Sequence, residues 1–323
     1  MATQLRLRSA NVLIINLGGI GTEIIKNLVL GGLSSIEILD DSTVKEEDFA
    51  AQFFLPNDDS CIGEVKLPLM INKIKELNNR VNLSINTNTL KHVLEDPAYF
   101  KKFDIVIATE LQKDEMFLLN SHTRTLNIPL YVTGLHGMFG YIFTDLIEHL
   151  SSSEKDAGNQ LREVGTKINR HKTITKVDYD EGSHKEVVTI LDEFVPLSEI
   201  FESKQLPKQL NRRQMKRLTA AVPLIFSLFE FDRIDPEEFI DKERLKSVAT
   251  DICEKLDIPA TVLSEEYLDM FASQAFTEFS PVAAILGGTL AQDVIQFLSK
   301  KESPINNVLI LDSRKSEMPI YLL

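Results

Sequence analysis

The segment VLIINLGGIG, residues 12–21, decides the fold class of this protein. Val12–Ile15 is short and wholly apolar, which is typical of a strand that helices cover on both faces. A turn with Gly18, Gly19 and Gly21 follows, and apolar residues at helical spacing come directly after it. A strand that passes through such a turn into a helix predicts an α/β protein with a Rossmann-like, doubly wound sheet.

The pattern divides the chain into three parts. Residues 1–150 alternate strands and helices, and we interpret them as a Rossmann-like core with a mostly parallel sheet. Residues 151–279 begin with a polar segment, 151–185, which predicts a linker, and continue as a helical insertion. Residues 280–323 return to the core, and their helix at 281–298 is apolar nearly all round, so we expect it to be buried. Predicted strands lie at 36–39, 83–85, 104–108, 130–132, 308–311 and 320–323, and further predicted helices at 66–77 and 113–126.

The composition excludes several classes of function. With 48 acidic and 35 basic side chains among 323 residues, the formal net charge is −13, so we expect no nucleic-acid partner and no membrane partner. No apolar stretch approaches the roughly 18 residues that a membrane-spanning helix needs. Two cysteines, Cys61 and Cys253, are too few for a disulfide framework and indicate a reducing compartment.

The glycine-rich turn allows two interpretations. In a nucleotide-binding fold the second glycine admits a phosphate, the third packs the helix on the strand, and a later acid binds a ribose hydroxyl. Asp40, nineteen residues after Gly21, stands in the place of that acid, but the first glycine is replaced by Asn16, which tolerates left-handed backbone. The alternative is a turn kept only for packing. A nicotinamide-dependent oxidoreductase is an alternative function, although none of the six histidines lies in an acid–base motif.

Five segments together resemble the adenylation fold of the enzymes that activate ubiquitin-like modifiers. They are 16–21 (NLGGIG), 39–42 (LDDS), 52–54 (QFF), 127–130 (NIPL) and 281–292 (PVAAILGGTLAQ). The similarity covers essentially the whole chain and is greatest to the smaller, non-catalytic subunits of heterodimeric SUMO-activating enzymes. Alternatives within the family are the equivalent subunits of NEDD8-activating enzymes, which carry a larger insertion, and homodimeric sulfur-carrier adenylyltransferases.

The resemblance implies that the groups needed for adenylation are missing. Catalytic halves of this family use an Asn and an Arg before the Gln-Phe pair, a Lys in a Gly-Lys-x-Lys run and a metal-binding Asp. The corresponding positions here are Ala50, Ala51, Glu64 and Leu111. Because the loss of one such group typically slows a reaction about 10²–10³-fold, we expect no catalytic residue, metal or cofactor site in this chain. A vestigial nucleotide loop is left, made of Asn16, Gly18, Gly19, Gly21 and Asp40.

Neither cysteine is expected to accept an activated modifier, because that step needs a thiolate in an electropositive, accessible setting. Cys61 follows Asp58 and Asp59 and precedes Glu64. Cys253 lies in an amphipathic helical pattern, which predicts that it is packed.

By the resemblance, the chain acts as one half of a pseudo-symmetric heterodimer. The larger catalytic subunit binds Mg·ATP, and SUMO is engaged through the complex. Candidate interface residues are Pro281, Gly287, Gly288 and Gln292, for which packing within the chain is an equally good explanation. Nuclear localisation, with the cytoplasm as a further compartment, follows from the resemblance as well.

Two further segments bear on these expectations. Five basic residues predict a solvated helix face, with a nuclear-import signal as the alternative: Lys208, Arg212, Arg213, Lys216 and Arg217. Met1–Ala10 matches the residues that follow the arginine-bearing N-terminal segment of the family, so we expect the chain as written to dimerise but to support adenylation poorly.

Overall fold

An eight-stranded sheet forms the centre of the protein. The computed structural model describes residues 2–158, 161–234 and 238–323. The strand order is β12-β11-β6-β5-β4-β1-β2-β3, in which the five strands from β5 to β3 pair in parallel and the remaining three pair antiparallel. The predicted doubly wound, mostly parallel sheet is therefore confirmed. Its strands are β1 (Asn11–Ile15), β2 (Ser35–Leu39), β3 (Asn82–Asn86), β4 (Ile105–Thr109), β5 (Leu130–His136), β6 (Phe139–Asp145), β11 (Val308–Asp312) and β12 (Ile320–Tyr321).

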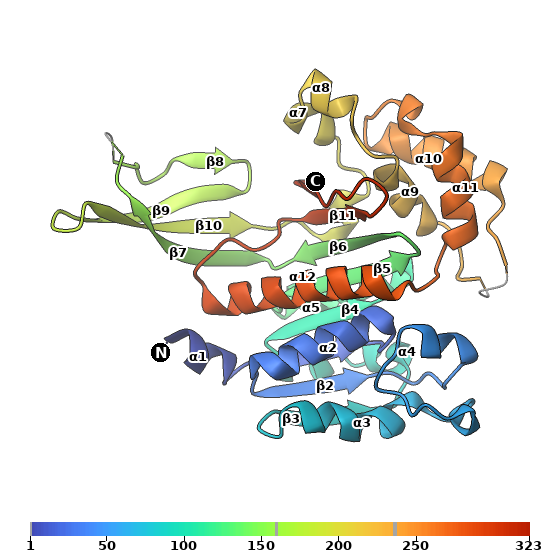
Figure 1. Ribbon diagram of the computed structural model, residues 1–323. Coiled ribbons are helices and arrows are strands. Elements are labelled where there is room, and N and C mark those ends of the chain that lie inside the picture. The colour runs from blue at the N-terminus through green and yellow to red at the C-terminus, as the bar shows by residue number, and fades with distance from the viewer. Residues whose placement is uncertain (1, 159–160, 235–237) are drawn as a thin grey trace.

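Helices cover both faces of this sheet, and α2 and α12 lie side by side on one of them (Figure 1). That face carries α1 (Ala2–Leu7), α2 (Gly19–Gly31), α3 (Lys66–Leu77) and α12 (Ser280–Ser299). The other face carries α4 (Leu90–Leu94), α5 (Lys113–Thr125), α6 (Leu197–Ile200), α9 (Ala221–Leu228), α10 (Lys242–Lys255) and α11 (Glu265–Gln274). Shorter helices are α7 (Leu206–Gln209), α8 (Arg212–Met215), η1 (Glu46–Ala50), η2 (Asp59–Cys61), η3 (Pro97–Lys102) and η4 (Ala260–Val262).

The structure of strand β1 explains why Val12–Ile15, four of its five residues, are all apolar. Val12 and Ile14 pack into the core beneath α2 and α12, whereas Leu13 and Ile15 pack into the core on the α5 and α9 side. All four side chains are fully buried. Because successive strand residues point to opposite faces, a strand covered on both faces buries its side chains on both, and Val12–Ile15 are accordingly all apolar after the half-buried Asn11 at the start of the strand.

Four strands within 148–156 and 167–193 form a second, antiparallel sheet, so the predicted linker at 151–185 is wrong for the described part of that segment. The sheet has the order β7-β10-β9-β8 and extends away from the central sheet in Figure 1. The linker prediction failed because this sheet is polar on most of its surface, and Ile174, Val188 and Ile190 form its small buried core. So few apolar residues produce no sustained alternation. Its strands are β7 (Glu148–Asp156), β8 (Lys167–Asn169), β9 (Lys172–Asp180) and β10 (Lys185–Glu193).

Helix α12 packs against the rest of the protein, which confirms the prediction that this apolar segment is buried, although only one of its sides is covered. Leu286 and Leu290 are fully buried against the core, whereas Ile285 on the opposite side is 48% exposed. By length and composition α12 would qualify to cross a membrane, contrary to the expectation that no stretch does, and half of its apolar window is buried in the protein. It packs on α2, α1 and β6, as a core helix does.

Candidate functional site

A cavity of about 730 Å³ opens where β1 and β2 end and α2 begins. This is the crevice at the carboxyl ends of parallel strands in which doubly wound folds bind ligands. Its walls come from four parts of the chain: the glycine-rich turn with the segment after β2, the end of β4, the residues that follow α9, and the residues before α12. The lining residues are Asn16, Gly18, Asp40, Asp41, Ser42, Thr43, Lys45, Glu47, Asp48, Ala50, Lys66, Glu110, Arg233, Ile234, Phe276, Thr277 and Glu278.

The turn after β1 keeps its shape without its first glycine. Asn16 adopts the left-handed conformation, with φ of 63°. Its side-chain amide donates to the Thr109 carbonyl at 2.8 Å, and the Thr109 hydroxyl donates to the Asn16 carbonyl at 2.9 Å. A Cβ atom at Gly21 would lie 2.7 Å from the Asn16 carbonyl oxygen, so Gly21 is required for the close approach of α2 to the turn. The prediction that Asn preserves this turn is confirmed.

The space that a phosphate would need is filled by Glu278. The backbone N–H of Gly19, in the first turn of α2, donates to Glu278 Oε1 at 2.7 Å. A Cβ atom at Gly18 would collide with the same carboxylate, and one at Gly19 would lie 2.8 Å from Glu278 Oε2 and 2.7 Å from the Ala51 methyl group. The glycines thus make room for two side chains of the protein itself.

Asp40 also serves the backbone. Its Oδ2 accepts from the N–H of Leu17 at 2.7 Å and its Oδ1 accepts from the N–H of Ser42 at 2.8 Å. The side chain is buried. Both carboxylate oxygens therefore hold the turn and the end of β2 together, which differs from the ribose-binding role that the spacing predicts.

A buried ion pair occupies the floor of the cavity. Lys66 Nζ lies 2.8 Å from Asp48 Oδ1, and about nine-tenths of each side chain is buried. Asp48 also accepts from the Gln52 amide at 2.5 Å and from the Lys45 N–H at 2.8 Å. Lys66, the second lysine position of the family's Gly-Lys-x-Lys run, is thus engaged by this protein's own carboxylate.

The four positions that the resemblance marks as lost differ in their surroundings. Ala50 lies at the cavity wall, and Ala51 is buried against the glycine turn. Glu64 is exposed, and its carbonyl accepts from the Val44 N–H at 2.8 Å. Leu111 is buried in the apolar core on the α5 side, where it has no ligand atom to offer a metal ion.

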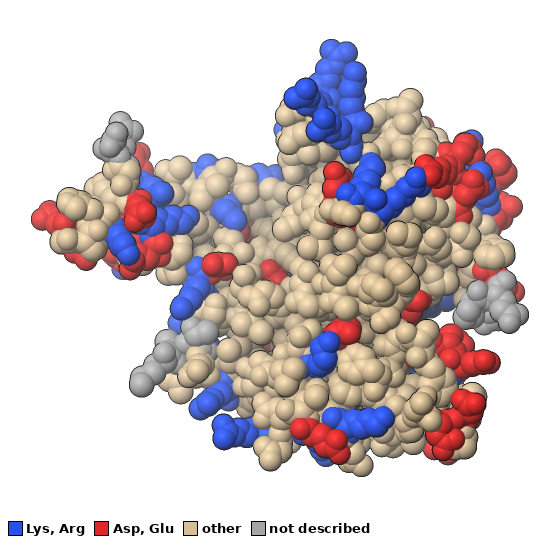
Figure 2. All heavy atoms as spheres, viewed as in Figure 1, with Lys and Arg blue, Asp and Glu red and all other residues tan. Residues whose placement is uncertain are grey.

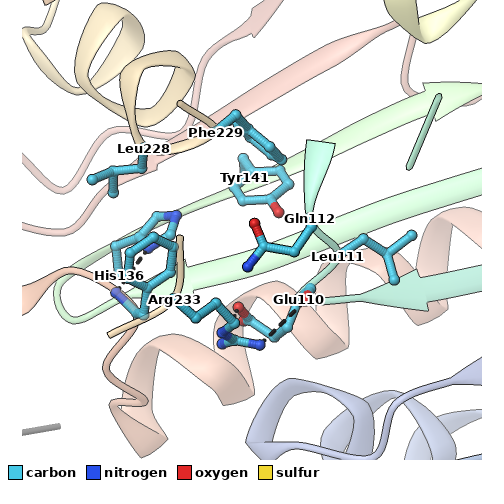
Figure 3. Close-up of a pocket in the computed structure, with 9 residues that line it drawn as sticks. Glu110, Leu111, Gln112, His136, Tyr141, Leu228, Phe229 and Arg233 are labelled. Carbon is cyan, nitrogen blue, oxygen red and sulfur yellow. Dashed lines mark hydrogen bonds and ion pairs between the residues drawn. The ribbon is translucent and has the colours of Figure 1, made fainter. Parts of the chain in front are cut away.

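Glu110 and Arg233 line both this cavity and a smaller neighbouring pocket, which is drawn in Figure 3. Arg233 Nη2 lies 3.0 Å from Glu110 Oε2, and the Leu135 N–H donates to Oε1 at 2.7 Å. Burial nevertheless raises the pKa of Glu110 to about 7. Burial lowers the pKa of neighbouring His136 to about 3, and its Nδ1 accepts from the Phe276 N–H at 3.1 Å.

The sequence offered no local signal for Glu278 or Arg233. Glu278 stands 259 residues after its partner Gly19, and Arg233 stands 123 residues after Glu110. Their positions become meaningful only when the chain returns to the carboxyl end of the sheet. Burial raises the pKa of Glu278, and the Gly19 N–H, Lys66 and Arg233 oppose that rise.

The cavity is unsuited to a nucleoside triphosphate with its metal. Six carboxylates but only three cationic side chains line it, and Glu278 and Ala51 fill the phosphate position. Across the described ranges, no cluster of three or more His, Cys, Asp or Glu side chains is arranged to hold a metal ion. Phosphoryl chemistry requires cations and metal ligands to balance developing negative charge, and these walls present the opposite charge.

The cysteines are packed away from this cavity. Cys61 is buried in the core beneath α2 and α3, and Cys253 is buried in α10. Burial raises the pKa of the Cys253 thiol to about 11, which keeps it protonated at neutral pH. The prediction that Cys253 is packed is confirmed.

The four candidate interface residues separate into two groups. Gly287 faces inward, and a Cβ atom there would lie 2.6 Å from Glu23 Cβ on α2, so it serves packing within the chain. Gly288 and Gln292 line a groove of about 630 Å³ on the outward side of α12. Pro281 is exposed at the start of the same helix. The groove continues over Ile285, Met318 and Ile320, which are exposed apolar side chains.

This fold, with its glycine-turn cavity, defines a protein of the adenylation-fold class, and the chain belongs to the ThiF family, whose model matches residues 1–321. The DNA damage tolerance protein RHC31 of Saccharomyces cerevisiae is 40% identical over 99% of this chain and 92% of its own length. The DNA damage tolerance protein rad31 of Schizosaccharomyces pombe is 32% identical over 99% and 92%, and SUMO-activating enzyme subunit 1 of Homo sapiens is 28% identical over 98% and 89%. The resemblance to enzymes that activate ubiquitin-like modifiers is thereby confirmed.

Proposed function

We propose that this protein is the non-catalytic small subunit of a SUMO-activating enzyme. It completes the adenylation unit of a larger catalytic subunit, which binds Mg·ATP, activates SUMO and passes it to a cysteine. Similarity over nearly the whole length to proteins named SUMO-activating enzyme subunit 1 supports the choice of modifier. The relatives reported above carry no name that points to a NEDD8 subunit or a nicotinamide-dependent oxidoreductase. Both oxygens of Asp40, which a ribose would need, already bind backbone.

The filled glycine turn carries the non-catalytic part of this proposal. An enzyme that adenylates a carboxylate must admit the α-phosphate of ATP to the first turn of α2. Here the Gly19 N–H is already bound to Glu278, and Lys66 is paired with Asp48. The positive groups that would receive a phosphate are thus neutralised within the chain.

The groove outside α12 supports the proposal that the protein works through a partner. Ile285, Met318 and Ile320 leave apolar surface uncovered beside Gly288 and Gln292. Strand β12, which carries Ile320, ends the sheet order, so its outer edge is available as well. We assign this surface to the larger catalytic subunit, because exposed apolar patches with a polar rim are typical of protein interfaces.

Copurification followed by a thioester assay tests the proposed function. The chain is coexpressed with candidate large subunits, and each complex receives Mg·ATP with SUMO or NEDD8 in parallel. We expect SUMO thioester on the large subunit only when this chain is present, and none on this chain. A thioester formed with NEDD8 but not SUMO, or a large subunit equally active alone, would contradict the proposal.

For localisation we propose the nucleus, with the cytoplasm as a second compartment, because the family resemblance implies it. The basic run lies on the projection formed by α7 and α8, where Lys and Arg gather in Figure 2. Arg212, Arg213, Lys216 and Arg217 are all exposed there. A fluorescent fusion should be nuclear, and a variant with these four residues changed to Gln tests whether they act in import: unchanged import would restrict them to a solvated surface.

A further inference from the structure

We infer that Glu278 is a built-in replacement for the nucleotide phosphate, which excludes nucleotide from this chain and stabilises the glycine turn in its place. This inference deepens the proposed non-catalytic role and rests on it only for its biological meaning. The geometry that supports it concerns Glu278, Gly18, Gly19 and the cations around them.

Glu278 makes one of the contacts expected of a phosphate bound at the start of a helix, and it occupies the space over the turn. A phosphate at the start of a helix accepts hydrogen bonds from backbone N–H groups and is favoured by the positive end of the helix dipole. Glu278 accepts from the Gly19 N–H at 2.7 Å, and its carboxylate fills the space above both Gly18 and Gly19. A side chain at position 18 or 19 would fit only if the Glu278 carboxylate were displaced.

The charges around Glu278 fit the same role. Lys66 and Arg233 lie close enough to favour its ionised form, as they would favour an anion bound at this point. Asp48 and Glu110 are the partners of these two cations, and they keep the surroundings from accepting a more highly charged group. Because these two carboxylates already balance the two cations, the positive end of α2 is what favours the single charge of Glu278, and a triphosphate would add negative charge that these residues do not balance.

The segment that carries Glu278 gives the contact a second consequence. Glu278 lies between α11 and α12, just before Phe279 and Ser280. Its bond to Gly19 ties the start of α12 to the start of α2, next to the packing of Gly287 on Glu23. Occupation of the phosphate position thus also fixes the helix whose outward side forms the proposed interface.

Anion rescue of a Glu278→Ala variant tests the inference. Thermal unfolding of the full-length chain is followed with increasing inorganic phosphate at ionic strength held constant with NaCl. We expect the variant to unfold at lower temperature than wild type and to bind phosphate at least tenfold more tightly. Phosphate at about ten times its Kd should raise the Tm of the variant by roughly 2–4 °C and leave the wild type unchanged. Glu278→Gln, which fills the same space without charge, is the matched control and should not respond.

Gly18→Ala provides a second measurement that does not depend on added anions. The Cβ atom of this variant meets only Glu278 among nearby side chains, and Gly18 has φ of −78°, which alanine adopts freely. Gly18→Ala should therefore lower the Tm of the wild type by more than it lowers the Tm of Glu278→Ala.

Three results would overturn the inference: equal phosphate responses in wild type and Glu278→Ala, no response in either, or additive effects of Gly18→Ala and Glu278→Ala. These outcomes are separate from the thioester assay. The thioester assay measures the chemistry of the larger subunit. It can therefore support the proposed function even if anion rescue contradicts the role of Glu278, and anion rescue can support that role even if the thioester assay contradicts the proposed function.

Discussion

Glycines lie both in the turn at the start of α2 and on the outward side of α12. The space beside them is filled by other side chains at the turn and is open at α12. At Gly18 and Gly19 the space left by the missing side chains is occupied by Glu278 and Ala51. At Gly288 the space is open and continues into an apolar groove. The space over the glycine turn is thus filled by the protein's own side chains, while the outward side of α12 is left uncovered. This contrast is what we expect of the proposed non-catalytic subunit, which would act through the surface that it leaves uncovered.

Lys66→Met should have the largest effect, because it tests whether the buried Lys66–Asp48 ion pair stabilises the cavity lining. Removal of the ammonium group leaves Asp48 buried without a counter-charge, which should lower the free energy of unfolding by roughly 3–5 kcal/mol. Urea unfolding of the full chain measures this. Lys45→Met is the matched control, because Lys45 lines the same cavity but its side chain is 61% exposed, and its loss should cost less than about 1 kcal/mol. Similar small costs for both variants would show that Lys66 is available to a ligand.

The next largest effect is a dependence of stability on pH that comes from Glu110. Its pKa is raised to about 7 in the folded protein, so the folded state keeps a proton that the unfolded state releases. Its contribution to stability is complete below about pH 4.5 and falls by roughly 3 kcal/mol as the pH rises to about 7.5. His136, with a pKa lowered to about 3, has the opposite slope, because its contribution is lost as the pH falls below about 6.5.

Comparison of wild type with Glu110→Gln isolates the pH dependence of stability that comes from Glu110, because both proteins contain His136. The difference in unfolding free energy between the two proteins should change by roughly 3 kcal/mol between pH 4.5 and 7.5. A difference that is constant over this range would mean that Glu110 ionises normally and that the cavity is more solvated than its geometry indicates.

Ile285→Glu tests the open region. A carboxylate in the middle of the groove should weaken binding to the catalytic subunit about 100-fold, equivalent to about 2.7 kcal/mol, because it becomes buried without a partner. Binding of purified subunits by calorimetry gives the value. Leu118→Glu is the control, since Leu118 is similarly exposed but lies on α5, on the opposite face of the sheet. Equal effects, or none for Ile285→Glu, would place the interface elsewhere.

The smallest expected change in stability comes from alanine substitutions at the adjacent Gly287 and Gly288. Gly287→Ala places a methyl group against Glu23 and should destabilise the chain by roughly 1–2 kcal/mol, after allowance for the better helix propensity of alanine. Gly288→Ala meets no atom within 4 Å and should stabilise the isolated chain by up to about 1 kcal/mol. Chemical unfolding of the two variants should therefore give opposite signs, and equal signs would remove the distinction between an inward and an outward glycine.

Much of the central sheet could be predicted from the sequence, because its rules are local. Val12–Ile15 is apolar throughout since both faces are covered, and Asn16 tolerates the left-handed turn that follows. The second sheet escaped prediction because its strands bury few apolar residues, and sheet pairing rather than burial defines it. Helix α12 has an apolar sequence on both sides, and burial on one side cannot be told from burial on both by periodicity alone.

The site was predicted in outline but not in its decisive contact. Asn16 and Asp40 were singled out by their spacing around the glycine turn, and Ala50 and Ala51 by the family resemblance. Glu278 is not, because its role depends on the fold that brings the start of α12 to the start of α2. A charged residue that follows Thr277 in a loop has no local pattern that distinguishes it from a solvated acid.

The number of nucleotides bound per complex tests the central claim most directly. Calorimetric titration of Mg·ATP into the full chain alone, and into its complex with the catalytic subunit, compares the two cases under the same buffer conditions. We predict no binding to the chain alone and one ATP for each heterodimer. Binding of one Mg·ATP to the chain alone, lost when Lys66 or the glycine turn is changed, would contradict the account.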